Sequence, residues 1–239
     1  MRRRLLTTVA LVVALAAAAP ATADHLPPRS IRLLPKSSGS PSTLAVNASF
    51  DQPPGAELQA YDVDIARGFR FDPRAVAGRC TPSQARASTC PASSRIGAGQ
   101  GQVHVTGPGV PGSDFTLDIA FYVMRPQQHG DIAGLVLAGR EPQSGLHFAL
   151  LGRMIRLAHG RYGLELRFDH TAGELPSGYT VQLHRVHVRI GARRVSHGVH
   201  YNLLVNPPSC SRGTWPFLLT VAYSSGTERY SAAGACTRR

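Results

Sequence analysis

The stretch Gly68–Gly101, GFRFDPRAVAGRCTPSQARASTCPASSRIGAGQG, joins the end of one strand pattern to a turn-rich loop that contains two cysteines, Cys80 and Cys90. A bond between these cysteines would close the loop on itself. The chain before the stretch carries an export signal, and nearly all of the chain after it alternates strand patterns with Gly and Pro turns. The stretch therefore predicts an all-β fold in which a disulfide holds a long connection.

The first residues predict export. Arg2–Arg4 precede an apolar run, Leu5–Ala19, and Ala21–Ala23 supplies the small-x-small pattern that signal peptidase cleaves. We expect residues 1–23 to be a signal peptide and the mature chain, from Asp24, to be secreted, extracellular or associated with the cell envelope. No later segment offers the ~20 apolar residues that a membrane-spanning helix needs, so we expect no transmembrane segment in the mature chain.

The mature chain is basic. Without Arg2–Arg4 it has 23 Lys and Arg against 14 Asp and Glu, a net charge of +9 with neutral histidines. The arginines are scattered and are not interleaved with aromatic residues, which argues against nucleic acid as a partner. Basic surfaces attract anionic polymers, so the expected partners are anionic cell-wall polymers or lipid head groups. The sequence does not indicate an oligomeric state.

Four cysteines in an exported chain predict two disulfides. Three pairings are open. We favour the local pairing, Cys80–Cys90 with Cys210–Cys236, because each pair brackets a compact, turn-rich segment. Each bond would stabilise the fold by roughly 3 kcal/mol through the loop that it closes in the unfolded chain.

Period-two alternation of apolar residues recurs along the chain, and no window of helical length competes with it. We expect a loosely ordered arm over 24–41 and, over 42–239, a single β-sandwich or jelly-roll-like domain of about ten antiparallel strands. Two changes of parity predict β-bulges, at Leu150–Leu151 and at His184–Arg185. The expected strands are Thr43–Phe50, Tyr61–Phe71, Gln102–Thr106, Phe115–Met124, Ile132–Leu137, Leu146–Leu157, Tyr162–Asp169, Val181–Ile190, Trp215–Tyr223 and a last strand ending near Cys236.

The bulge at His184–Arg185 would have a consequence for charge. It would bring Arg185, His187 and Arg189 onto one face of a strand whose other face is apolar. We expect these three residues to form an anion-binding face.

Two sequence patterns carry a resemblance. They are the run Gly68–Pro73 before the first cysteine, followed by Cys90–Gly99, and the segment Asn206–Cys210 followed by Trp215 and Cys236. They resemble the G-F-x-F-D-P, C-P-x-S-x-I-G-x-G and N-P-P-x-C segments of uncharacterised exported β-rich proteins of high-GC Gram-positive bacteria. The resemblance implies export, β-structure and paired cysteines, and it implies no activity.

Motifs of catalytic and metal-binding sites are missing from the chain. His184 and His187 are three residues apart, as are His197 and His200, but on a strand this spacing sends side chains to opposite faces unless a bulge intervenes. There is no HExxH, CxxC or GxSxG motif. We therefore expect no metal site, no cofactor and no catalytic residue.

Two functional hypotheses remain. The first is an exported, non-enzymatic β-sandwich that binds the cell envelope or an anionic polymer. The alternative is a secreted hydrolase of cell-wall carbohydrate that uses two of the carboxylates Asp62, Asp64, Asp118 and Glu165. Two carboxyl groups that face each other across a concave cleft at roughly 5–10 Å would favour the hydrolase.

Overall fold

The structure is a computed structural model that describes residues 29–50, 52, 56–143, 145, 147–169, 178 and 180–238. The expected signal peptide, residues 1–23, lies outside the described residues. Among the helices of the described part, none has the length and apolar character that crossing a membrane requires.

The described chain is almost entirely β-structure, with one short α-helix, α1 (Pro82–Arg86), and two 3-10 turns, Pro73–Ala75 and Ala92–Ser94. The strands are β1 (Arg29–Leu34), β2 (Pro41–Ser49), β3 (Leu58–Ala66), β4 (Arg70–Phe71), β5 (Arg95–Gly107), β6 (Val110–Met124), β7 (Asp131–Arg140), β8 (His147–Arg156), β9 (Tyr162–Phe168), β10 (Thr180–Ile190), β11 (Arg193–Ser196), β12 (Val199–Asn202), β13 (Leu204–Val205), β14 (Thr214–Tyr223) and β15 (Gly226–Ala235).

Hydrogen bonds join 13 strands into one antiparallel sheet, in the order β15-β14-β3-β9-β8-β7-β6-β5-β10-β2-β13-β4, with β1 paired to β2. β11 and β12 form a separate hairpin. The all-β, antiparallel prediction is confirmed. The division into two packed sheets, which a sandwich requires, is not shown, because the pairing runs continuously through a single sheet.

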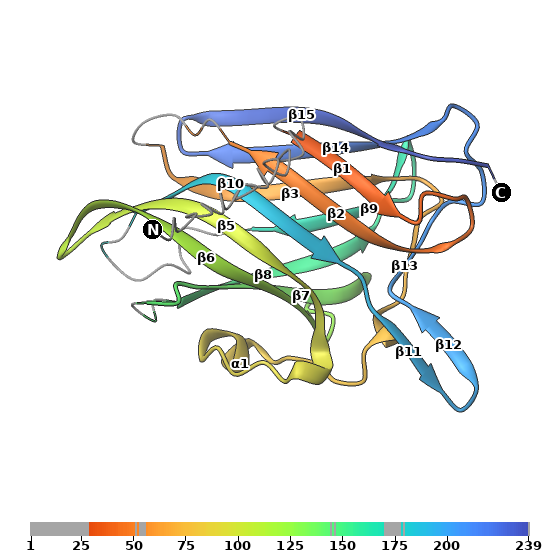
Figure 1. Ribbon diagram of the computed structural model, residues 1–239, viewed down its shortest axis with the longest axis horizontal. Coiled ribbons are helices and arrows are strands. Elements are labelled where there is room, and N and C mark those ends of the chain that lie inside the picture. The colour runs from red at the N-terminus through yellow and green to blue at the C-terminus, as the bar shows by residue number, and fades with distance from the viewer. Residues whose placement is uncertain are drawn as a thin grey trace, which may run out of the picture.

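The sheet curls around its apolar face (Figure 1). One buried cluster contains Leu33 of β1, Ile119 of β6, Phe168 of β9 and Phe217 of β14, which are far apart in the strand order. β1 lies against β15, and a Cβ at Gly234 would come within 3.2 Å of Leu33 Cδ1. Large twisted sheets of more than about 10 strands rarely stay open and flat, so curling is the expected way to bury this face.

An aromatic cluster lies between the β3–β4 connection and the start of β14, near the end of the molecule that carries the C-terminus, on the right in Figure 1. Phe69 packs edge-on against Trp215 at 5.4 Å between ring centroids and tilted against Phe217 at 5.7 Å. The Trp215 indole N–H donates to the Ser209 carbonyl at 2.9 Å. We call this end of the interior the Phe69 end. The opposite end, which we call the Tyr61 end, is where the β5–β6, β7–β8 and β14–β15 hairpins turn.

Asn206, within the N-P-P-x-C segment, anchors the connection between β1 and β2. Its side chain is buried, accepts from the Ser42 hydroxyl at 2.6 Å and donates to the carbonyls of Pro35 and Ser37, each at 2.9 Å. A buried amide with its donors and acceptor satisfied fixes chain geometry without the cost of an unpaired polar group.

Two expected boundaries differ from the structure. Residues 24–41 were assigned above to a loosely ordered arm, but Arg29–Leu34 forms β1, because Ile31 and Leu33 pack into the core. The expected strand Tyr61–Phe71 is interrupted at Gly68, whose φ of +97° turns the chain between β3 and β4.

Both predicted disulfides are confirmed, with Cα–Cα distances of 5.0 Å for Cys80–Cys90 and 5.9 Å for Cys210–Cys236. The first holds α1 on the outer face of β6, β7 and β8, where Ala85 packs in a small cluster with Met124 and Val136. Thr81 caps α1 in a capping box with Gln84.

The bulge predicted at Leu150–Leu151 is wrong. The register of β8 with β7 runs without a shift through Leu150 and Leu151. Leu150 points inward, and Leu151 packs against the outer cluster beneath α1. Both faces of β8 are apolar here because both are covered.

Candidate functional site: an apolar cavity inside the sheet

The inner face of the curled sheet lines a cavity of about 180 Å³. Its lining comes almost wholly from inward-facing apolar side chains of β1, β2, β3, β5 to β10, β14 and β15. An engineered apolar cavity of about 150 Å³ stays dry and takes up benzene, so this volume is enough for a small hydrocarbon. Side chains that border the cavity include Val46, Val63, Phe148, Val186, Ile190 and Leu219.

Inward-facing side chains around the cavity are only partly packed. Val46, Val63, Val186 and Leu219 keep intermediate exposure although each points to the apolar side of its strand. Further toward the Phe69 end, inward residues such as Leu164 are fully buried. The interior is therefore well packed at the Phe69 end and less completely packed around the cavity, while Val105 and Val221 toward the Tyr61 end are again fully buried.

Glycines on the inner face of β5 bring neighbouring strands close to the cavity. Gly97, Gly99 and Gly101 share the parity of the buried Val103. A Cβ at Gly99 would lie 2.0 Å from the His187 carbonyl oxygen, and one at Gly101 would lie 2.9 Å from Ile119 Cδ1. Side chains at Gly99 and Gly101 would therefore push β5 away from β10 and β6.

Tyr61 brings a polar group to the cavity wall. Its ring stacks on Phe168 at 4.7 Å between centroids. Its hydroxyl is buried and has no hydrogen-bond partner within the described part of the chain. Burial raises the pKa of Tyr61 well above its ordinary value, so the group stays a neutral phenol that can donate or accept one hydrogen bond.

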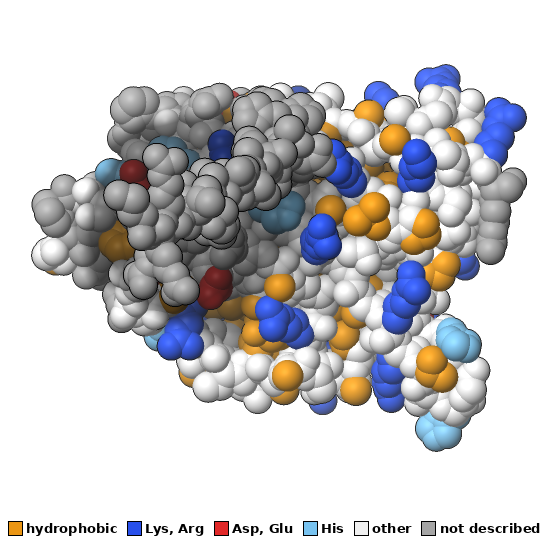
Figure 2. Space-filling view, viewed as in Figure 1, with side chains coloured by type: hydrophobic (Ala, Val, Ile, Leu, Met, Phe, Trp, Pro, Cys, Tyr) orange, Lys and Arg blue, Asp and Glu red, His pale blue; other side chains and the backbone are white. Residues whose placement is uncertain are grey.

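The predicted anion-binding residues lie on the outer face of β10. Pairing with β5 shifts between Leu183 and Arg185, which confirms the bulge predicted there. Arg185, His187 and Arg189 are all exposed, and Val188 on the other side is buried. Lys and Arg side chains are spread over the face in Figure 2, where few Asp or Glu side chains appear. The residues opposite the three positions are Ser49, Asn47, Ala45, Gln102, Gln100 and Ala98.

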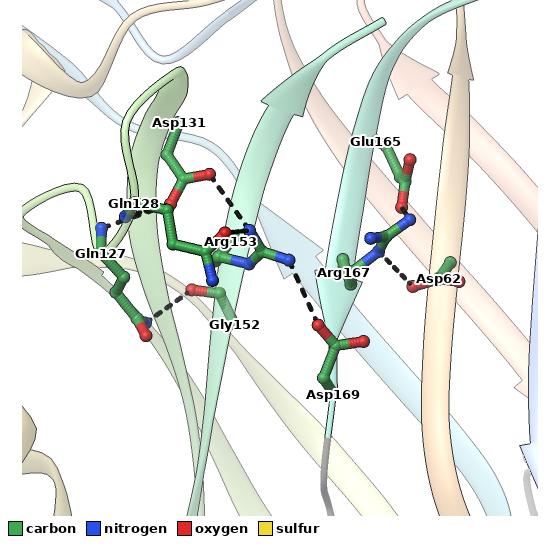
Figure 3. A network of polar contacts seen from close by, with 9 residues as sticks. All are labelled: Asp62, Gln127, Gln128, Asp131, Gly152, Arg153, Glu165, Arg167 and Asp169. Carbon is green, nitrogen blue, oxygen red and sulfur yellow. Dashed lines mark hydrogen bonds and ion pairs between the residues drawn. The ribbon is translucent and has the colours of Figure 1, made fainter.

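Two of the candidate acid and base residues, Asp62 of β3 and Glu165 of β9, lie on the outer face of the sheet, where they pair with arginine (Figure 3). Arg167 Nε lies 3.4 Å from Asp62 Oδ1, and its guanidinium also contacts the buried Glu165. In the neighbouring group, Arg153 lies 3.5 Å from Asp131 and 3.3 Å from Asp169. Carboxylates and guanidinium groups therefore lie side by side across four adjacent strands, β3, β9, β8 and β7.

This arrangement does not match a pair of catalytic carboxylates. Burial raises the pKa of Asp62 against the opposing effect of Arg167, and burial together with the Asp62 charge raises the pKa of Asp64. Asp62 and Glu165 bind the same guanidinium on the convex side of the sheet and do not face each other across a cleft. Asp118 is exposed on β6, four strands away in the sheet order.

A histidine cluster that the sequence reasoning missed lies at the Tyr61 end. His104 of β5, Asp114 of β6 and His184 of β10 have potential ligand atoms that all lie within 4.8 Å of one another. The pairs His184/His187 and His197/His200, which the sequence analysis considered for their spacing, do not form a cluster of potential metal ligands within the described residues.

Comparison of the chain with protein-family models, with curated proteins and with solved structures finds no match.

The Arg167 network predicts a pH-dependent loss of stability. Arg167→Gln should lower the free energy of unfolding at pH 7 by about 1–3 kcal/mol, because Asp62 and Glu165 lose their counter-charge. The loss is smaller than for a fully buried ion pair, because the Arg167 guanidinium is partly exposed. Since raised carboxyl pKa values favour folding at low pH, protonation of Asp62 and Asp64 should reduce the loss near pH 4, about the ordinary pKa of an aspartate.

Urea denaturation at the two pH values measures this difference. Arg86→Gln, on the exposed side of α1, is the charge-matched control and should change the free energy of unfolding by less than about 0.5 kcal/mol. An equal loss for Arg167→Gln at both pH values would contradict the electrostatic explanation.

Proposed function

We propose that the protein is a non-enzymatic binding protein that takes up a small apolar molecule, or the end of an acyl chain, in the cavity of the curled sheet. The observation that carries the proposal is a cavity of about 180 Å³ lined almost entirely by apolar side chains. Binding pockets for small molecules are typically concave and mostly apolar, with a few polar groups that fix orientation.

The size of the cavity limits the ligand. By proportion to the engineered cavity that takes up benzene, it accommodates roughly six to eight carbon atoms. A longer acyl chain would place only its end in the interior. The filled Phe69 end stops a chain from passing through, so the rest of such a ligand would extend toward the Tyr61 end.

The Tyr61 hydroxyl adds a polar contact to this ligand. A buried hydroxyl without a partner costs about 1–3 kcal/mol, and a ligand atom that accepts or donates one hydrogen bond would remove that cost. The ligand class that fits best therefore combines a hydrocarbon body with a hydroxyl or carbonyl oxygen.

Filling the cavity should abolish binding without unfolding the protein. Val186→Phe places a larger side chain in the empty volume, so we expect benzene affinity to fall at least about tenfold while the free energy of unfolding changes by less than about 1 kcal/mol, below the usual cost of overpacking a full core. NMR titration with benzene and chemical denaturation measure the two effects.

The matched control is Thr116→Phe, which adds the same ring on the exposed face of β6. It should bind benzene like the wild type. If Val186→Phe binds benzene as tightly as the control does, the cavity is not the binding site.

Tyr61→Phe separates the polar contact from the apolar one. Loss of the unpartnered hydroxyl should raise the free energy of unfolding of the ligand-free protein by about 1 kcal/mol. It should weaken binding of phenol about 5- to 10-fold and leave benzene affinity unchanged, because the two ligands differ by one hydroxyl. Calorimetric titration of both ligands measures the contrast, and equal effects on both would rule out a hydrogen bond to Tyr61.

The outer face of β10 favours a second function, contact with phosphate-bearing anionic surfaces of the cell envelope. The observation that supports it is the row of exposed Arg185, His187 and Arg189. The residues paired with them on β2 and β5 are uncharged. Basic side chains near an anionic membrane contribute about 1 kcal/mol each. Such contact would bring the cavity close to a source of acyl chains.

Arg185→Ser combined with Arg189→Ser should weaken binding to phosphatidylglycerol vesicles about tenfold or more, and added salt should weaken wild-type binding by screening. Vesicle co-sedimentation measures this, with phosphatidylcholine vesicles and soluble teichoic acid as separate arms that distinguish a lipid surface from a wall polymer. Arg86→Ser with Arg229→Ser removes the same charge from α1 and β15. An equal loss of vesicle binding in both double variants would mean that only the net charge of the protein matters, and it would contradict a specific role for the β10 face.

A further inference from the structure

We propose that His104, Asp114 and His184 form a binding site for a divalent transition-metal ion, with Zn²⁺ as the best fit, on the outer face at the Tyr61 end. The three residues come from the adjacent strands β5, β6 and β10. His104 lies directly opposite Asp114, and their ring nitrogen Nδ1 and carboxylate Oδ1 are 2.8 Å apart. The site is separate from the cavity, because the neighbours of His104 on β5, Val103 and Val105, point inward.

The β-bulge in β10 places His184 in this cluster. Pairing with β5 passes from Leu183 to Arg185, so His184 is the extra residue and is exposed together with Arg185. Without the extra residue, strict alternation would put His184 and Arg185 on opposite faces. Bulges commonly re-aim a side chain in this way.

The backbone around His184 is held in place. The Phe50 N–H donates to the His184 carbonyl at 2.9 Å, and the Leu183 N–H donates to Gln52 Oε1 at 3.2 Å. The chain that follows β2 therefore fixes the bulge from its free side. A ligand residue on a fixed backbone loses little conformational freedom when it binds an ion.

The distances suit a small cation after side-chain rotation. The His104 and His184 rings lie 6.3 Å apart at 74° to each other, and the ligand atoms of all three residues lie within 4.8 Å of one another. Zinc ligands lie about 2.0–2.2 Å from the ion, which puts the ligand atoms about 3.3 Å apart. The Asp114 side chain is 83% exposed, so it has room to rotate toward this spacing.

The donor set selects the class of ion. Two imidazoles and one carboxylate suit zinc and its transition-metal neighbours, whereas calcium and magnesium prefer all-oxygen sites. Because the residues lie on an outer face, water would complete the coordination. A bound ion would link three neighbouring strands near the ends of the β5–β6 and β9–β10 connections and so stabilise this end of the sheet.

The experiment uses the full chain with both disulfides intact and without a polyhistidine tag. Zn²⁺ affinity is measured by competition with a chromophoric chelator, and Mg²⁺ is the negative control ion. His104→Gln and His184→Gln should each weaken Zn²⁺ binding at least about tenfold, since even residues that only support a metal ligand are worth 10- to 100-fold. Zn²⁺ should raise the melting temperature of the wild type and leave that of the double variant His104→Gln/His184→Gln unchanged.

His147→Gln is the matched control, because His147 is an exposed histidine of β8 that lies outside the cluster, with its ring Nδ1 3.3 Å from the Gly145 carbonyl oxygen. It should bind Zn²⁺ like the wild type. Asp114→Asn, which leaves the bulge and both histidines in place, should also weaken binding and so guards against a folding defect at His184. Unchanged affinity in His104→Gln and His184→Gln, or an equal loss in His147→Gln, would overturn the proposal.

Discussion

The structure depends on the need to bury one apolar face of a single large antiparallel sheet. Apolar residues alternate along nearly every strand, and a flat sheet of 13 strands would leave that face in water. Curling brings β1 against β15, so that residues from strands far apart in the sheet order share one core. No second layer of helices covers the face in the described residues, and the sheet therefore supplies both walls of its own interior.

The same constraint explains why the interior contains a cavity. Side chains pack an interior completely only where their combined volume matches the space between the walls. At the Phe69 end, three aromatic rings provide that volume. Between the two ends the walls carry valines and glycines such as Val186 and Gly101, and space remains. The outer face carries the charge, either as arginine–carboxylate groups on β3, β8 and β9 or as the basic row on β10.

Sequence periodicity predicted the strands and one of the bulges because parity is a local property. In β10 the apolar residues change sides at His184, and the register shift there follows directly. The same reasoning failed at Leu150–Leu151, because α1 covers the outer face of β8 and makes both parities apolar. The signal that could have indicated this helix is the capping box formed by Thr81 and Gln84.

The cavity and the histidine cluster could not be predicted in this way. Alternation shows which side of a strand is apolar, but the curvature of the sheet decides whether opposite walls meet. His104 and His184 are 80 positions apart in the chain, and only the pairing of β5 with β10 brings them together. The carboxylates Asp62 and Glu165 likewise looked available for catalysis until the pairing of β3 with β9 placed Arg167 between them.

The central claim, that the interior of the curled sheet receives an apolar ligand, is tested most directly by NMR of the methyl-labelled protein with benzene. The account predicts nuclear Overhauser effects from benzene to the inward methyl groups of Val46, Val186 and Leu219, and none to the outer Leu151 and Val195. Effects confined to the outer methyl groups, or none at all at benzene concentrations near saturation in water, would contradict it.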